Sequence, residues 1–209
     1  MTKIQLALDR LTKEKCFEIV EQTEPYIDFI EVGTGVIKEF GMSIVREMSE
    51  RFPDKKIVSD MKTRDAGKHE AKQAFEAGAH ITTVMAFASN QTIEDMLAVA
   101  NEYGQQIMVD LLGVTDSTRV EELHLLGIRM FNIHIGIDLQ KDVAWGAEHF
   151  QLTNQLSDIQ LVVSGGINRE LLPLLMTQQP SVVIVGSAIT GHSNPAEAAK
   201  GIQEGVAQF

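Results

Sequence analysis

The sequence has a single cysteine, no long apolar run and fewer basic than acidic residues. Cys16 alone cannot form a disulfide within the chain, which excludes a disulfide-stapled fold and indicates a reducing compartment. Charges interrupt the apolar run of the first 15 residues too early for a signal peptide or a membrane span. We therefore expect a cytoplasmic protein that does not enter membranes.

Basic residues are in deficit. The chain has 18 Lys and Arg against 29 Asp and Glu, a formal net charge of −11. Such a surface repels nucleic acid and anionic membranes, so we expect neither as a partner. An anionic substrate is not excluded, because a local site can offer backbone N–H groups or a nearby base.

No low-complexity linker and no break in composition divides the chain, so residues 1–209 are predicted to form one domain. Runs rich in Val, Ile and Leu recur about every 25 residues and predict strands. The runs are 4–9, 29–33, 56–62, 80–85, 106–112, 130–135, 159–166 and 182–189.

Helical spacing of apolar residues fills several of the intervals, at 12–23, 41–52, 67–78, 92–104 and 116–127. Thr12, Thr92 and Asp116 are candidate N-caps. Alternating strands and helices predict a parallel sheet with right-handed crossovers, and eight such units predict a closed (β/α)₈ TIM barrel. An open doubly wound sheet is the alternative, disfavoured because no G-x-G-x-x-G follows the first strand.

Ionisable residues stand at the carboxyl ends of the predicted strands, where TIM barrels place their active sites. Each has an ordinary interpretation alone: Asp9 could cap a helix, and His134 could be a buried structural histidine. A buried strand has no structural need for six such groups at one end, which favours a shared site. The six residues are Asp9, Glu31, Asp60, Lys62, Asp110 and His134.

The segment 60–65, DMKTRD, is the sharpest motif. Strand side chains alternate, so Asp60 and Lys62 are predicted to point into the barrel mouth and Met61 toward the helices. Asp65 follows on the loop, and the three charged groups could form an acid–lysine–acid chain. Two anions would keep Lys62 protonated, and a fixed ammonium can stabilise the oxyanion of an enediolate.

Hard oxygen ligands are predicted at the ends of two neighbouring strands. Glu31 and Asp60 repel each other unless a cation lies between them, and Mg²⁺ prefers one or two carboxylates plus water and substrate oxygens. Such an ion could act as a Lewis acid on a carbonyl. No Cys/His cluster indicates zinc.

Two glycine-containing loops predict a phosphate site. The seventh run ends at Gly165 and Gly166, and the eighth contains Gly186 and Ser187. Many TIM barrels bind phosphate with the loops after strands seven and eight. Glycines let backbone N–H groups approach an anion closely.

These motifs together resemble the orotidine 5′-phosphate decarboxylase suprafamily. The resemblance covers nearly the whole chain, and it is closest to the branches that hold 3-hexulose-6-phosphate synthases and 3-keto-L-gulonate-6-phosphate decarboxylases. It is carried by IQLALD (4–9), IEVGT (30–34), DMKTRDAG (60–67), HIGIDLQ (134–140), SGGI (164–167) and VIVGSAIT (183–190).

The resemblance implies a role for each matched residue. Glu31 and Asp60 would bind Mg²⁺, Asp9 and Asp110 would contact a sugar-phosphate substrate, and the glycine loops with Ser187 would hold its phosphate. Lys62 and Asp65 would stabilise the enediolate, and His134 would transfer the proton. Asp65 would reach into the site of a second copy, which implies a homodimer.

Three positions separate the two branches. The decarboxylase branch has Glu at the position of Asp110 and Arg at the positions of Ile137 and Ser187, so this chain matches the synthase branch at all three. Ala144-Trp145-Gly146 instead resembles the decarboxylases. Thr63-Arg64 and Ala86-Phe87 match neither branch well.

The function these features predict is an aldolase-type lyase. It would interconvert D-ribulose 5-phosphate plus formaldehyde with D-arabino-hex-3-ulose 6-phosphate through a magnesium-stabilised enediolate. The alternatives are a 3-keto-L-gulonate-6-phosphate decarboxylase and a non-catalytic sugar-phosphate-binding barrel.

Overall fold

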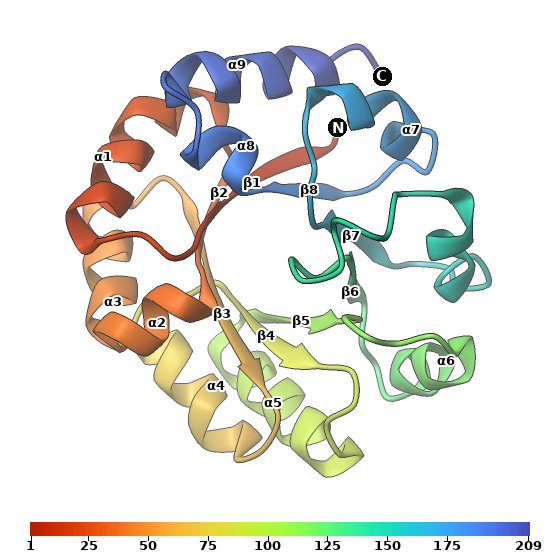
Figure 1. The fold of residues 1–209 in the computed structure, drawn as a ribbon. Helices are drawn as coiled ribbons and strands as arrows, with labels where there is room; N and C mark the ends of the chain where they lie inside the picture. The colour runs from red at the N-terminus through yellow and green to blue at the C-terminus, as the bar shows by residue number, and fades with distance from the viewer.

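The computed structural model describes all residues, 1–209, and its eight parallel strands close into a barrel in chain order. Figure 1 looks along the barrel, with the strands in a ring and the helices outside them. The predicted (β/α)₈ barrel is confirmed, and the open sheet is excluded because β8 pairs with β1. The strands are β1 (Lys3–Leu8), β2 (Phe29–Val32), β3 (Lys56–Thr63), β4 (Ile81–Met85), β5 (Gln106–Asp110), β6 (Met130–His134), β7 (Gln160–Ser164) and β8 (Val182–Val185).

Nine α-helices and three short 3₁₀ helices join the strands. None of the helices combines the length and the apolar character needed to cross a bilayer. The α-helices are α1 (Lys13–Thr23), α2 (Thr34–Phe40), α3 (Met42–Arg51), α4 (Gly67–Glu76), α5 (Asn90–Tyr103), α6 (Ser117–Leu125), α7 (Leu172–Met176), α8 (Ser187–Thr190) and α9 (Pro195–Val206), and the 3₁₀ helices are η1 (Glu24–Tyr26), η2 (Ala147–Leu152) and η3 (Arg169–Leu171).

Side-chain caps fix where several helices begin. The predicted caps Thr12 and Asp116 are confirmed, since each accepts a hydrogen bond from a backbone N–H of the first helical turn. The prediction of Thr92 was wrong. Ser89 caps α5 by accepting from the backbone N–H of Thr92, which lies inside the helix. Ser89 and Thr92 both carry a hydroxyl and lie three residues apart, so the sequence alone offered two equivalent candidates for the cap.

The barrel interior holds an apolar layer below a polar one. Inward side chains of β2 to β8 form the lower layer, with Ala7 of β1 packed against it, and alternation along the strand then places polar groups two residues further on. Phe29, Val58 and Met108 are followed in this way by Glu31, Asp60 and Asp110. The lower layer consists of Phe29, Val58, Ile81, Met108, Met130, Val162, Val182 and Ile184.

Two predicted stretches differ from the structure. The run 182–189 was predicted as one strand, but β8 ends at Val185 and α8 starts at Ser187. Apolar content alone does not separate a buried strand from a short buried helix, and Ile189 of α8 is fully buried. The crossover from β6 to β7 also has only the 3₁₀ helix η2, although the predicted pattern of eight βα units implies an α-helix in each crossover.

Candidate active site

Lys62 lies at the centre of a charged network at the mouth. Its Nζ is 2.7 Å from Oδ2 of Asp60 and 3.2 Å from Oδ2 of Asp110. Both carboxylates are almost completely buried, and Lys62 is about a quarter exposed. The predicted contact between Asp60 and Lys62 is therefore present. The acid on the other side of the lysine is Asp110 from β5, where Asp65 had been expected.

The backbone at Lys62 is irregular, which simple alternation did not anticipate. Its φ is +47°, and the register between β3 and β4 shifts between Ser59 and Thr63. Thr83 stabilises this conformation: its hydroxyl accepts from the N–H of Lys62 at 2.8 Å and donates to Oδ1 of Asp60 at 2.8 Å. An uncommon backbone conformation held by specific hydrogen bonds is typical of a functional site.

The two acids keep Lys62 charged. Burial alone would lower the pKa of this ammonium, but the negative charges of Asp60 and Asp110 outweigh burial and raise the pKa above its ordinary value. A lysine in this state is a poor nucleophile and a good fixed cation. The geometry therefore suits charge stabilisation better than Schiff-base chemistry.

Asp110 and His134 form a second pair beside this lysine. Nδ1 of His134 lies 2.9 Å from Oδ2 of Asp110, whose Oδ1 also accepts from the N–H of Leu112 at 2.9 Å. Burial raises the pKa of Asp110, but the hydrogen bond and charge of His134, with Lys62 and Leu112, hold it below its ordinary value. An ionised Asp110 favours the proton on Nδ1 of His134, which leaves Nε2, unpartnered in the protein, as a base.

Glu31 of β2 is buried at the neighbouring strand end. Its Oε2 accepts a hydrogen bond of 2.7 Å from the side chain of Gln5. Burial, followed by repulsion from Asp60, raises the pKa of Glu31 to about 8, against the smaller opposing effect of Gln5. Two buried acids on paired strands thus share one nearby ammonium, and they would both ionise more easily beside a cation.

The donor set fits a magnesium ion better than a metal that needs a protein cage. No group of three or more His, Cys, Asp or Glu side chains is arranged to hold an ion. Mg²⁺ does not require one, because it keeps water and substrate oxygens in its octahedral shell. Asp60 already accepts three hydrogen bonds, from Thr34, Thr83 and Lys62, which fix its orientation. Glu31 and Asp60 are the two ligands the chain could offer.

Asp9 and Asp65 lie outside this network. Oδ1 of Asp9 accepts from the N–H of Gly35 at 2.9 Å, so its carboxylate binds the first turn of α2, and its side chain is 40% exposed. Asp65 is exposed and makes no ion pair within the chain. Beside it, the guanidinium of Arg64 lies over the ring of Phe87, which is 54% exposed.

The predicted phosphate-loop glycines lie at the same end of the barrel. Gly165 and Gly166 follow β7 with φ of +104° and +66°, and Gly186 follows β8 directly before Ser187 and α8. None of the three glycine N–H groups is bonded to another group of the protein. Free amides in a tight turn can bind an anion.

Gly165 is the glycine that tolerates a side chain least. A Cβ there would lie 2.0 Å from the carbonyl oxygen of Ile135, and its φ is strained for any other residue.

We expect Gly165→Ala to lower the free energy of unfolding by about 3 kcal/mol. Urea titration would measure this. As a control, Gly201→Ala in α9 meets no atom closer than 3.7 Å. It should be neutral or raise stability by up to about 1 kcal/mol. Equal effects of the two substitutions would contradict this account.

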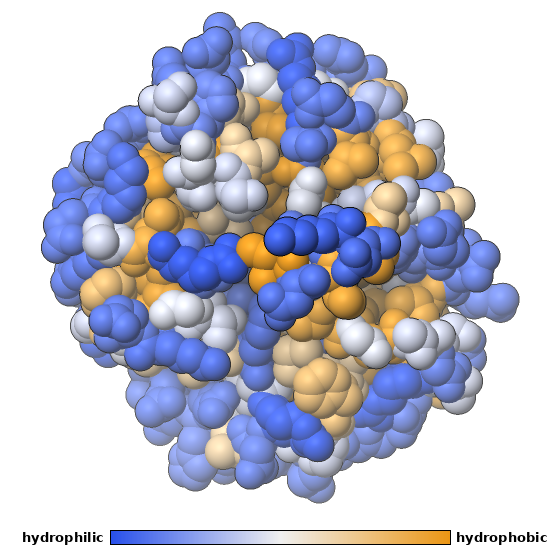
Figure 2. Space-filling model, in the orientation of Figure 1, coloured by the Kyte–Doolittle hydropathy of each residue, from blue (hydrophilic) through white to orange (hydrophobic).

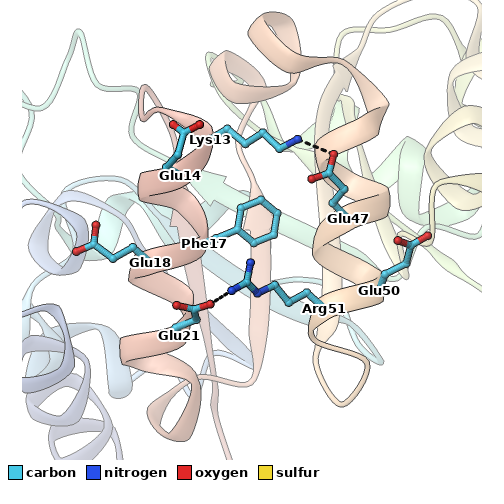
Figure 3. Close-up of a pocket in the computed structure, with 8 residues that line it drawn as sticks. All are labelled: Lys13, Glu14, Phe17, Glu18, Glu21, Glu47, Glu50 and Arg51. Atoms are coloured by element: carbon cyan, nitrogen blue, oxygen red, sulfur yellow. Dashed lines mark hydrogen bonds and ion pairs between the residues drawn. The ribbon is translucent and has the colours of Figure 1, made fainter.

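A surface groove lies elsewhere, between α1 and α3 (Figure 3). Its walls are joined by the ion pairs Lys13–Glu47 and Arg51–Glu21, and Phe17 forms part of its base. Exposed pairs of this kind contribute little energy. None of the predicted site residues lines the groove, so its walls do not share the chemistry of the mouth.

Figure 2 shows the front face in the orientation of Figure 1, with hydrophilic residues across its centre beside apolar ones.

Comparison with known proteins places the chain among its relatives. The family model described as "Orotidine 5′-phosphate decarboxylase / HUMPS family" matches residues 2–202. The chain belongs to this family. It is 35% identical to 3-hexulose-6-phosphate synthase of Bacillus subtilis over 211 residues, which cover 99% of both proteins.

Solved structures of family members superpose closely. 3-Hexulose-6-phosphate synthase of Salmonella typhimurium has a TM-score of 0.96 at 32% identity, over 99% of each chain. 3-Keto-L-gulonate-6-phosphate decarboxylase of Vibrio cholerae has a TM-score of 0.90 at 30% identity, over 100% of this chain and 98% of its own. Both branches therefore share this barrel, and side chains at the mouth must distinguish them.

Sequence reasoning missed three residues that support the family's charged motif. Thr83 and Thr34 hydrogen-bond Asp60, and Gln5 hydrogen-bonds Glu31. Gln5 left a usable signal, an amide inside the apolar run 4–9, and the structure buries it fully. Thr83 left none, because a threonine is ordinary in a strand.

Proposed function

We propose that the chain is a carbon–carbon lyase of the 3-hexulose-6-phosphate synthase type. It would join D-ribulose 5-phosphate to formaldehyde and form D-arabino-hex-3-ulose 6-phosphate, and would also run the reverse cleavage. The observation that carries the proposal is the network of Asp60, Lys62, Asp110 and His134, which combines a fixed cation with an oriented base. The similarity to synthases across the whole chain supports it.

The reaction begins with loss of a proton. Nε2 of His134 removes a proton from C1 of ribulose 5-phosphate, and the electrons of that C–H bond form the 1,2-enediolate. The ammonium of Lys62 stabilises the negative charge that develops on oxygen. C1 then attacks the carbon of formaldehyde, and the former aldehyde oxygen takes the proton held on Nε2 of His134, which gives the product hydroxyl and regenerates the base. Asp110 keeps the imidazole oriented in every step.

A magnesium ion bound by Glu31 and Asp60 would act as a Lewis acid toward the carbonyl and hydroxyl oxygens of the sugar. The phosphate would lie against the N–H groups that follow β7 and β8, near Gly165, Gly166, Gly186 and Ser187. Asp9 would contact the sugar from the end of β1.

The decisive assay supplies ribulose 5-phosphate, formaldehyde and Mg²⁺ to the purified protein. We expect rapid consumption of ribulose 5-phosphate that depends on formaldehyde. The second candidate, the 3-keto-L-gulonate-6-phosphate decarboxylase, forms the same kind of intermediate by losing CO₂, and Trp145 with its neighbours resembles that branch. Ile137, which is 49% exposed, offers no cation to deliver a proton after decarboxylation. CO₂ release faster than aldol formation would reverse the choice.

Magnesium should stabilise the wild type through Glu31. An ion at 100 times its Kd contributes about 2.7 kcal/mol, which is about 5–10 °C in Tm for a domain of this size. We expect Glu31→Gln to lose this Mg²⁺-dependent shift and to be at least as stable as the wild type without Mg²⁺, because burial and Asp60 disfavour an ionised carboxylate here and the amide cannot ionise. Thermal unfolding with MgCl₂ and with EDTA would measure both.

The exposed Glu94 provides the control for this prediction. Glu94→Gln should keep the full shift with MgCl₂. A Glu31→Gln protein that Mg²⁺ stabilises as strongly as the wild type would show that the ion binds elsewhere.

We also propose a homodimer in which Asp65 completes the site of the partner. Asp65 is exposed and outside the network of its own chain, and the exposed ring of Phe87 under Arg64 lies beside it. An apolar ring next to a charged loop suits a surface covered by a second copy. A cytoplasmic location and the lack of nucleic-acid partners remain predictions from the sequence.

Complementation tests the shared site. Lys62→Met and Asp65→Asn should each be nearly inactive alone. Co-expressed chains should recover roughly a quarter of wild-type activity, because random pairing makes half of the dimers mixed and each mixed dimer has one intact site. Activity no higher than the sum of the two parents would mean that Asp65 acts within its own chain, or not at all.

A further inference from the structure

The segment between β6 and η2, residues 135–146, contacts the Gly165–Gly166 turn along its length. Near its end, the indole N–H of Trp145 donates to the carbonyl oxygen of Gly165 at 2.8 Å. In its middle, Gln140 lies beside Gly166, close enough that a Cβ on the glycine would be 3.4 Å from its Oε1. The segment has no α-helix to hold it, so these side-chain contacts fix its position on the turn.

Trp145 is held in place from the other side. Its side chain is buried, and its ring centroid lies 5.4 Å from that of His149 and 5.8 Å from that of Phe150. Packing by two rings leaves the indole little freedom to turn. A buried indole N–H needs an acceptor, and here the acceptor is the Gly165 carbonyl.

The hydrogen bond sets the orientation of one peptide plane. In a trans peptide, the C=O of Gly165 and the N–H of Gly166 point in opposite directions. With the carbonyl held by Trp145, the N–H of Gly166 is presented on the side away from the indole. That N–H donates to no group of the protein. Both residues of this peptide are glycines, which have a wide choice of backbone angles, and the indole hydrogen bond restrains its rotation.

We propose that Trp145 is a positioning residue for the phosphate of the substrate: it holds the Gly165–Gly166 peptide so that the Gly166 N–H can bind a phosphate oxygen. The inference rests on the proposed function, because it takes that turn as the phosphate site. The same segment starts directly after His134, so the phosphate contact and the base are joined by one stretch of chain. Trp145 would touch neither the substrate nor the reacting atoms.

Trp145→Phe tests the proposal, because it keeps an aromatic ring and removes only the N–H donor. We expect a five- to tenfold rise in the Kd for inorganic phosphate, measured by calorimetry, and a similar rise in KM for ribulose 5-phosphate. The kcat should change less than twofold. Phe150→Leu is the matched control, since it loosens the same packing and leaves the N–H in place. It should lower Tm and raise the phosphate Kd less than twofold, because His149 still packs against the indole and the N–H donor is kept.

Two results would overturn the proposal. If Trp145→Phe lowers Tm but binds phosphate as tightly as the wild type, the residue is only structural, and the proposed function still stands. If the wild type binds neither phosphate nor ribulose 5-phosphate, the proposed function fails and the inference fails with it.

A measurement on the wild type does not depend on how well the variant folds. Trp145 is the only tryptophan of the chain, so its emission reports on this contact alone. Titration with inorganic phosphate should change the emission saturably, with the Kd found by calorimetry. An emission that stays constant up to calorimetric saturation would contradict the proposal.

Discussion

Lys62→Met will lower kcat by at least about a thousandfold. Removal of a single donor to a developing oxyanion costs about 10²–10³ in rate. Here the loss is larger, because the ammonium also holds Asp60 and Asp110 in place at 2.7 and 3.2 Å. Steady-state assay of aldol formation would measure the change. The variant should also be less stable, since two buried carboxylates lose their counter-ion.

Two further measurements keep this prediction specific. Lys72→Met removes an exposed lysine of α4 that pairs only with Glu76, and it should leave kcat unchanged. Phosphate binding by folded Lys62→Met should survive, which separates an enzyme from a simple sugar-phosphate-binding barrel. Turnover within tenfold of the wild type would contradict the role of the ammonium. Borohydride trapping of substrate on Lys62 would replace charge stabilisation with a Schiff base.

His134→Asn will lower kcat by about 10²–10⁴, the usual contribution of a general base. Asparagine is chosen because its amide can take the place of Nδ1 and still donate to Asp110, while nothing replaces Nε2. The hydrogen bond to Asp110 is thereby kept, so the loss of kcat can be assigned to proton transfer. Stopped or steady-state assays at saturating ribulose 5-phosphate would measure it.

The matched control is the exposed His69 of α4, which makes no hydrogen bond through its side chain. His69→Asn should retain full activity. If His134→Asn keeps more than a tenth of wild-type kcat, another group removes the proton.

Much of the fold could be predicted because its signals are local. Apolar runs and helical spacing are properties of a few neighbouring residues, and eight such units leave few ways to close a sheet. The predicted boundaries of helices and strands were wrong where one local pattern fitted two possibilities, as at Thr92 and in the stretch after Val185.

The pairing of charges at the site was harder to predict. The alternation of side chains along a strand predicts which face of the barrel a side chain occupies, but not which other strand it contacts. Lys62 of β3 pairs with Asp110 of β5, past Thr83 of the intervening β4. That contact depends on the left-handed backbone at Lys62. A φ of +47° at a residue other than glycine could not be predicted from any pattern in the sequence.

The pairing of Asp110 with His134 could be predicted only in part from the sequence. Both Asp110 and His134 were placed at the mouth by their positions at strand ends, yet their contact follows from the pairing of β5 with β6 and the rotamers chosen there. Thr83 is ordinary in a strand, and its part in the site follows only from its two hydrogen bonds, with Lys62 and Asp60. The hydrogen bond of Trp145 to the Gly165 carbonyl likewise follows from the path of the chain and could not be predicted from the sequence.

Hydrogen exchange at C1 of ribulose 5-phosphate tests the central claim, that this barrel forms an enediolate with His134 as its base. The protein is incubated with ribulose 5-phosphate and Mg²⁺ in D₂O, without formaldehyde, and the C1 signals are followed by proton NMR. The account predicts loss of one of the two C1 protons, abolished by His134→Asn and retained in His69→Asn. An enzyme that forms the aldol product yet never exchanges a C1 proton, or exchanges it equally well without His134, would contradict it.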